Sequence, residues 1–177
     1  MSPTVWFAHG LDGVPWGRKI TALAAVARDR GLDVASPDYS FTRDPDERVR
    51  HLLAQRPPTG KGLILVGSSM GGYVSAVAGE SLRPAAMFLM APALHMPGYQ
   101  AEPVPTAGRL EVVHGWNDEV IPVEHAWRFA ARWRAALHVL DADHALTEAL
   151  PELEALFGRF LDAVLGAPGG DGSSVDQ

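Results

Sequence analysis

The sequence predicts an α/β protein in which one parallel sheet of about six strands lies between two layers of helices. Short aliphatic runs, typical of strands buried on both faces, alternate with segments whose apolar residues recur at helical spacing. The connections between successive strands are long enough to hold a helix, as in right-handed βαβ units. We therefore expect a three-layer α/β/α sandwich.

The predicted strands occupy, in chain order, residues 4–8, 32–36, 63–66, 85–90, 109–113 and 136–140. The predicted helices occupy residues 18–30, 45–55, the segment around 73–78, 123–133 and 146–165. Local signals support these bounds, since Asp44 is a suitable N-cap before Pro45, and Gly31 suits the position after a helix end. The longest irregular segment, residues 93–108, is Pro-rich, and ordered loops of this length are usually functional.

Length and composition are typical of one globular domain. The 177 residues are 47% apolar and 20% charged, which allows a substantial core in a single unit. We expect one domain over residues 1–166 and a disordered tail, rich in Gly, Ser and Asp, over residues 167–177.

Charge and cysteine content argue against several classes of protein. The net charge is −6 and no basic patch is present, so we expect no nucleic-acid partner. The absence of cysteine excludes disulfides, a thiol nucleophile and thiolate metal ligands, and it suits the cytoplasm. The apolar run at residues 5–8 is too short for a signal peptide, and no segment approaches a membrane span. We expect a cytoplasmic protein without a membrane partner.

The motif Gly67-x-Ser69-x-Gly71 stands between the predicted strand at 63–66 and the helix that follows it. A strand that turns into a helix within one residue holds that residue in a strained conformation and lifts its side chain clear of the sheet. The residues two before and two after must be small, because a Cβ there would strike the neighbouring chain. The motif therefore predicts a nucleophile elbow with Ser69 at its apex.

The neighbouring Ser68 does not fit this frame. If Ser68 were the nucleophile, the residues two before and two after it would have to be small, but these are Val66 and Met70, which both carry bulky side chains. The turn also lacks the glycine spacing of a dinucleotide site and the Gly-Lys-Ser/Thr of a P-loop. A glycine-rich turn without chemistry is the alternative that the motif alone leaves open.

A serine hydroxyl becomes a competent nucleophile only when a base takes its proton and an acid orients that base. His144 follows the last predicted strand, and Asp118 follows the strand before it. Because the carboxyl ends of parallel strands meet at one edge, we expect both residues to lie near Ser69. Asp143 is the alternative acid, and a helix cap is the alternative role for Asp118.

Over residues 5–165 the chain resembles the α/β-hydrolase-fold serine hydrolases. The resemblance is carried by His9-Gly10, Gly67-x-Ser69-x-Gly71-Gly72, His114-Gly115-x-x-Asp118-x-x-Ile121-Pro122 and Asp143-His144. The order of Ser, Asp and His along the chain is also that of the family. The resemblance implies that Ser69 is the nucleophile, Asp118 the acid and His144 the base. It further implies an oxyanion hole made by the backbone amides of Leu11 and Met70.

Compared with the full-size fold, the first two strands are missing and the cap is reduced to residues 93–108. The chain thus resembles the small, lidless bacterial hydrolases that act as esterases. The resemblance implies cleavage of a small-molecule ester, or of a thioester or amide, through an acyl-enzyme. A non-catalytic ligand-binding or protein-binding member of the same fold is the alternative.

Other polar and aromatic residues near the predicted site have open roles. Trp16 and Trp116 flank it and His95 lies on the Pro-rich loop, so all three are candidate substrate contacts; a core or rim position is the alternative for the tryptophans. His9 and His114 are expected to anchor loops. No pair of histidines has helical metal-ligand spacing, so we expect no metal and no cofactor.

Overall fold

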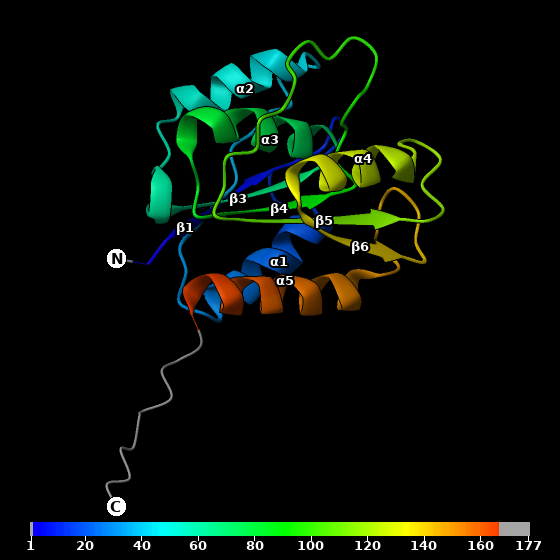
Figure 1. The fold of residues 1–177 in the computed structure, drawn as a ribbon. Helices are drawn as coiled ribbons and strands as arrows, with labels where there is room; N and C mark the ends of the chain where they lie inside the picture. Colours follow the sequence, from blue (N-terminus) through cyan, green and yellow to red (C-terminus); the bar gives the residue numbers. More distant parts are fainter. Residues whose placement is uncertain (1, 167–177) are drawn as a thin grey trace, which may run out of the picture.

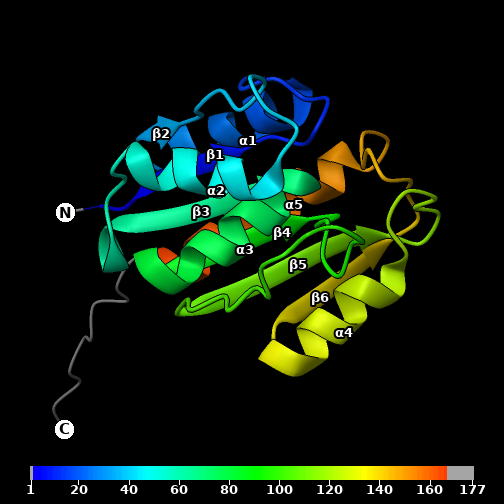
Figure 2. The same cartoon turned by 90° about the horizontal axis from the view of Figure 1, so that it is seen from above.

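Six strands form one parallel sheet in the computed structural model, which describes residues 2–166. Across the sheet the order is β2 (Val34–Ala35), β1 (Thr4–Ala8), β3 (Leu63–Ser68), β4 (Ala86–Met90), β5 (Arg109–Gly115) and β6 (Ala136–Leu140). Every neighbouring pair is parallel, and Figure 2 shows the sheet from β2 at one edge to β6 at the other. The predicted parallel sheet is confirmed.

Helices cover both faces of the sheet, which confirms the three-layer prediction (Figure 1). One face carries α2 (Pro45–Ala54), α3 (Met70–Leu82) and α4 (Val123–Trp133). The other face carries α1 (Arg18–Arg28) and α5 (Leu150–Leu165). Every strand except β4 leads into a helix, and the connections that follow the strands meet at the carboxyl edge of the sheet.

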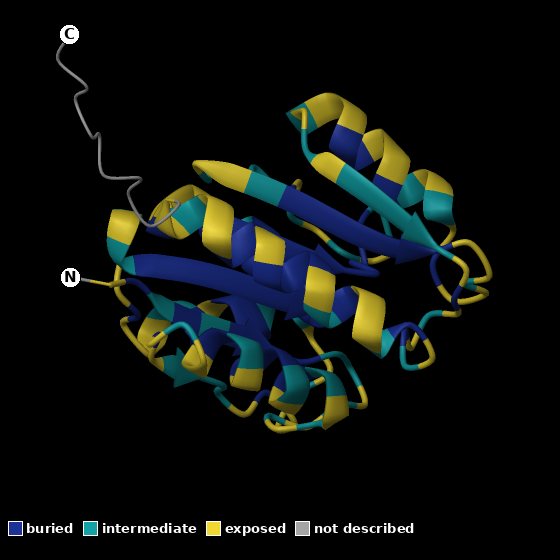
Figure 3. Ribbon diagram, turned by 90° about the horizontal axis from the view of Figure 1, so that it is seen from below, coloured by how far each residue is buried: buried dark blue, intermediate teal, exposed yellow. Residues whose placement is uncertain are grey.

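The central strand β3 is buried along its whole length, and its side chains alternate between two apolar clusters. Ile64 and Val66 pack toward α1 and α5, whereas Leu63 and Leu65 pack toward α2 and α3. Figure 3 shows the central strands as buried, between helices whose outer faces are exposed. This burial on both faces fixes the end of β3, and with it the residue that follows, in one position.

Several predicted boundaries are wrong, and for three elements the reason is local. The strand expected at 32–36 is reduced to Val34–Ala35, because this edge strand pairs with β1 at two positions only and Pro37 has no N–H to continue the ladder. The helix expected from residue 146 begins at Leu150, since Leu146 has a left-handed φ of 57°. The helix expected to reach residue 30 ends at Arg28, two residues before the left-handed Gly31.

Between β4 and β5 the chain forms neither helix nor strand, so residues 2–166 contain no cap domain. The predicted tail at 167–177 lies outside the described residues. Over the part of the chain that the structure describes, every helix is too short or too polar to cross a membrane.

Candidate active site

Ser69 stands at the junction of β3 and α3 with a φ of 54° and a ψ of −120°, a backbone conformation that residues other than glycine rarely adopt. Two glycines permit this turn. A Cβ on Gly67 would overlap the carbonyl group of Gly71, and a Cβ on Gly71 would overlap the carbonyl group of Ala8. The strained turn and the need for small residues around it are therefore confirmed.

The hydroxyl of Ser69 faces an imidazole. Its Oγ lies 3.0 Å from Nε2 of His144, and Nδ1 of the same ring lies 2.8 Å from Oδ2 of Asp118. The carboxylate can only accept, so Nδ1 carries the proton and Nε2 is free to accept from the serine. Three residues that lie on different loops thus form one continuous hydrogen-bonded chain, as their positions after strand ends predicted.

The carboxylate of Asp118 is completely buried and held from two sides. Its Oδ1 accepts from the backbone amides of Val120 and Ile121, at 2.9 and 2.8 Å, which leaves Oδ2 for His144. The alternative acid, Asp143, instead accepts from the amide of Leu146 through Oδ1 at 3.1 Å. The structure therefore brings Asp118, and not Asp143, to the ring of His144.

His114 is a second histidine beside Asp118. The side chain is fully buried, and its Nε2 lies 2.9 Å from the carbonyl oxygen of Ile121 and 3.2 Å from Oδ2 of Asp118. Burial lowers the pKa of His114, although the hydrogen bond to Ile121 and the charge of Asp118 act in the opposite direction. A neutral His114 that donates from Nε2 to Ile121 thus anchors the loop between β5 and α4, as predicted. The same nitrogen also lies beside the carboxylate of Asp118.

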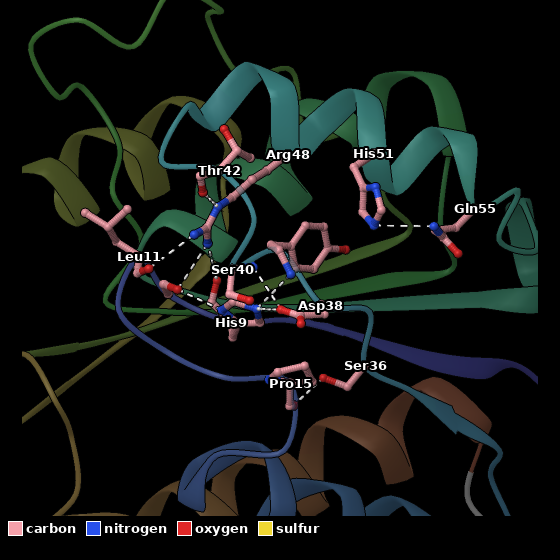
Figure 4. A network of polar contacts seen from close by, with 12 residues as sticks. His9, Leu11, Pro15, Ser36, Asp38, Ser40, Thr42, Arg48, His51 and Gln55 are labelled. Atoms are coloured by element: carbon pink, nitrogen blue, oxygen red, sulfur yellow. Dashed lines mark hydrogen bonds and ion pairs between the residues drawn. The ribbon is translucent and has the colours of Figure 1, made fainter.

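His9 anchors the loop after β1, again as predicted. It is 2% exposed; its Nδ1 donates to the carbonyl oxygen of Gly10 at 2.8 Å, and its Nε2 accepts from the amide of Tyr39 at 3.0 Å (Figure 4). These two bonds fix the neutral tautomer with the proton on Nδ1. Its ring nitrogens are thus both engaged within the protein, and His9 ties the loop after β1 to the loop after β2.

The amides of Leu11 and Met70, expected to form an oxyanion hole, belong to residues that line the same cavity as Ser69. Met70 is the first residue of α3, where an amide has no partner within the helix and the helix dipole favours negative charge. The backbone hydrogen bonds of the described residues include none donated by either amide. Two donors are therefore free beside the serine.

The cavity in front of Ser69 has a volume of about 530 Å³. Much of its wall is apolar, with contributions from Val14, Ile20, Met96, Tyr99, Val120 and Ile121. The Pro-rich loop supplies part of this wall, so that segment contributes to the site even though it forms no cap. The lining thus offers an apolar surface with the serine and histidine on one side.

Lys19 also lines this cavity. Burial lowers its pKa to about 8, while the negative charges of Asp143 and Asp118 act to raise it. No sequence signal pointed to Lys19, because a lysine near the start of a helix usually faces water.

The three tentative substrate contacts are not among the residues that line the cavity. Trp16 is 46% exposed and lies beneath the guanidinium of Arg28, and Trp116 is 63% exposed. His95 faces a separate, smaller hollow of about 100 Å³. A substrate-binding role for any of them stays a prediction. No group of three potential metal ligands occurs among residues 2–166, and the absence of a metal or cofactor also stays a prediction.

Solved structures share this fold. One, from Xanthomonas campestris pv. campestris and assigned to the α/β superfamily of hydrolases, is 28% identical with a TM-score of 0.83 and covers 92% of this chain and 99% of its own. Est1E from Butyrivibrio proteoclasticus is 17% identical with a TM-score of 0.78, covering 92% and 88%. A third, described as an α/β serine hydrolase without a lid from Xanthomonas campestris, is 19% identical with a TM-score of 0.63, covering 92% and 83%.

No protein-family model and no curated protein matches the sequence, so the relationship rests on these structures and on the motifs. The first of these structures is covered over 99% of its length and matches this chain with a TM-score of 0.83. The chain is therefore a small α/β-hydrolase-fold protein, with no cap domain over residues 2–166.

Proposed function

We propose that this protein is a serine hydrolase that cleaves a small ester through an acyl-enzyme on Ser69. The observation that carries the proposal is the hydrogen-bonded chain from Ser69 through His144 to Asp118, at the wall of a cavity. The similarity to proteins described as hydrolases supports a hydrolytic activity in general.

In the proposed first step, Nε2 of His144 takes the hydroxyl proton while Oγ of Ser69 attacks the ester carbonyl carbon. The carbonyl oxygen becomes an oxyanion, which the amides of Leu11 and Met70 stabilise. The tetrahedral intermediate then collapses, the bond to the alcohol oxygen breaks, and the imidazolium returns its proton to the departing alcohol. Asp118 holds the ring and stabilises its positive charge throughout.

In the second step, water enters after the alcohol has left. His144 takes one proton from the water as its oxygen attacks the acyl-enzyme, and Oγ of Ser69 then leaves with that proton, which releases the carboxylic acid. Esters are favoured over amides because an alkoxide leaves with less assistance than an amine. A thioester would follow the same steps.

Rapid mixing with p-nitrophenyl butyrate tests the proposal. An acyl-enzyme predicts an initial burst of p-nitrophenol with an amplitude close to the enzyme concentration whenever deacylation is the slower step. If deacylation is faster, trapping with a slowly hydrolysed carbamate reveals, by its mass, a carbamoyl group on the same serine. Turnover without any adduct would contradict the mechanism. The absence of both turnover and adduct would favour a binding protein of the same fold.

The rate is expected to rise with pH through a single ionisation, because only the neutral ring of His144 can accept the proton of Ser69. The measurement is kcat/KM on one ester between about pH 5 and pH 8. Above about pH 7 the deprotonation of Lys19, which lines the same cavity and whose pKa is lowered to about 8, also contributes, so the rise below that pH is the part assigned to His144. A rate that falls over this interval would rule out His144 as the base.

Short acyl chains are expected to be the best substrates. Each methylene gains roughly 0.8 kcal/mol only where it is buried, and the uncapped cavity has an open side. On a series of p-nitrophenyl esters, kcat/KM should peak at about two to six acyl carbons, where the chain still lies against the apolar wall. No interfacial activation is expected, since no cap covers the site. A continued rise to about twelve carbons would show that the protein buries the longer chain elsewhere.

A further inference from the structure

Arg48 is a buried arginine whose guanidinium binds the loop after β1. The residue lies on α2 and is 1% exposed. Its Nη1 donates to the carbonyl oxygens of His9 and Gly10 at 3.4 and 3.1 Å, and its Nη2 donates to that of Leu11 at 3.1 Å. Figure 4 shows the side chain reaching from the helix toward this loop. One planar group thus holds three successive peptide carbonyls.

The charge of Arg48 is balanced mainly by dipoles. Its Nε donates to the carbonyl oxygen of Thr42 at 2.9 Å, so all of its hydrogen bonds among the described residues are to backbone carbonyls. Burial lowers the pKa of Arg48, and Asp38 is the only carboxylate among the groups that act to raise it. A buried charge is a poor source of stability, which makes a role in the site a better explanation for this residue.

The peptide unit between Gly10 and Leu11 is the one that Arg48 fixes most firmly. Its carbonyl oxygen accepts from Nη1 of Arg48 at 3.1 Å, from Nδ1 of His9 at 2.8 Å and from the amide of Gly13 at 3.2 Å. In a planar trans peptide the C=O and N–H groups point in opposite directions. Three donors on the carbonyl oxygen therefore turn the N–H of Leu11 away from α2.

The serine lies close to this peptide. A Cβ on Gly10 would stand 3.3 Å from the Cβ of Ser69, and Gly10, Leu11 and Ser69 all line the cavity. In the proposed mechanism the amide of Leu11 must face the reacting carbonyl, so the orientation in which Arg48 holds this peptide bears directly on the site. The positively charged guanidinium of Arg48, which binds the carbonyl oxygen of Gly10, also polarises this peptide and makes its N–H a stronger donor.

We propose that Arg48 is a positioning residue, which holds the Gly10–Leu11 peptide in the orientation that an oxyanion requires. The role of this orientation in catalysis rests on the proposed hydrolase function. Since the oxyanion develops only during the reaction, loss of Arg48 should lower kcat and leave KM nearly unchanged. A residue needed only for stability would lower the amount of folded enzyme but not the kcat of the folded fraction.

The first test compares the kinetics of Arg48→Met with those of the wild type on p-nitrophenyl butyrate, with folded enzyme counted by circular dichroism. We expect kcat to fall by about 10²-fold, the effect of losing one oxyanion donor, with KM changed by less than about threefold. Arg48→Lys should give an intermediate kcat, because an ammonium restores the charge but not the planar fork. It also keeps the proposal testable if Arg48→Met does not fold.

Arg30→Met is the matched control, since it removes another arginine, whose Nε donates to Asp162 at 2.7 Å, and neither of these two residues lines the cavity. It should lower stability without changing kcat. A wild-type kcat in folded Arg48→Met or Arg48→Lys would overturn the proposal.

A second readout is independent of activity. Crystal structures of the wild type and Arg48→Lys, and of Arg48→Met if it folds, should show the Gly10–Leu11 peptide rotated or displaced in the variants only. An unchanged peptide would overturn the proposal even if the rates differ. Should the wild type hydrolyse no ester, the proposed function fails, while the comparison of structures still decides whether Arg48 sets the peptide orientation.

Discussion

Replacement of Ser69 by alanine is expected to remove nearly all ester hydrolysis and to leave the fold intact. The hydroxyl is the proposed nucleophile, and without it the acyl-enzyme cannot form, so kcat/KM should fall by at least about 10³-fold. The structure should tolerate the change, because Ser69 is only partly buried at the cavity and its one side-chain hydrogen bond among the described residues is to His144. Hydrolysis by the purified variant and its thermal unfolding are the two measurements.

Labelling with a fluorophosphonate identifies the reacting oxygen directly. The probe should shift the mass of the peptide that contains Ser69, and the label should be absent from Ser69→Ala. Ser68→Ala is the matched control: Ser68 is the last residue of β3 and only 6% exposed, and its variant should keep the label. Because both serines fall in one peptide, fragmentation must assign the site. A label on Ser68 would contradict the assignment of Ser69 as the nucleophile, which rests on the positions of Gly67 and Gly71.

Asp118→Asn should lower kcat by on the order of 10³–10⁴-fold. An asparagine can still accept from the amides of Val120 and Ile121 through its carbonyl oxygen, so the loop should keep its shape. Its NH₂ group would then face Nδ1 of His144 and favour the tautomer with the proton on Nε2. That tautomer cannot take a proton from Ser69. Steady-state kinetics with unfolding controls measures the effect.

Asp143→Asn is the control for this choice of acid. Its carboxylate accepts from the amide of Leu146, and a neutral amide oxygen can do the same, so little loss of kcat is expected. If Asp143→Asn proved the more damaging of the two substitutions, the proposed acid would be wrong.

The elbow and the convergence of the three side chains could be predicted because they depend on local or topological rules. Gly67 and Gly71 occupy the two positions at which a strand-to-helix turn of this kind leaves no room for a Cβ. Asp118 and His144 follow strands, and parallel strands deliver their ends to one edge. Neither inference required knowledge of how distant side chains pack.

What could not be predicted depends on the path of loops. Arg48 precedes Leu52 by four residues and so shares the buried face of α2, but nothing in the sequence says that a loop nearly forty residues earlier supplies carbonyls to it. Trp16 and Trp116 stand close to site residues in the sequence and yet lie outside the cavity lining. The direction of a loop side chain follows from the loop's own hydrogen bonds and is not encoded by spacing.

The contact between Gly71 and the carbonyl group of Ala8 bears on how this protein can evolve. The backbone of the first turn of α3 lies directly against the end of β1, so the segment with the Met70 amide and the start of the loop with the Leu11 amide are in close backbone contact. Any side chain at position 71 would separate them, whereas the cavity wall can change residue by residue. If the proposed function holds, selection can alter the substrate preference through the cavity wall, while the spacing of these two amides stays unchanged because position 71 tolerates only glycine.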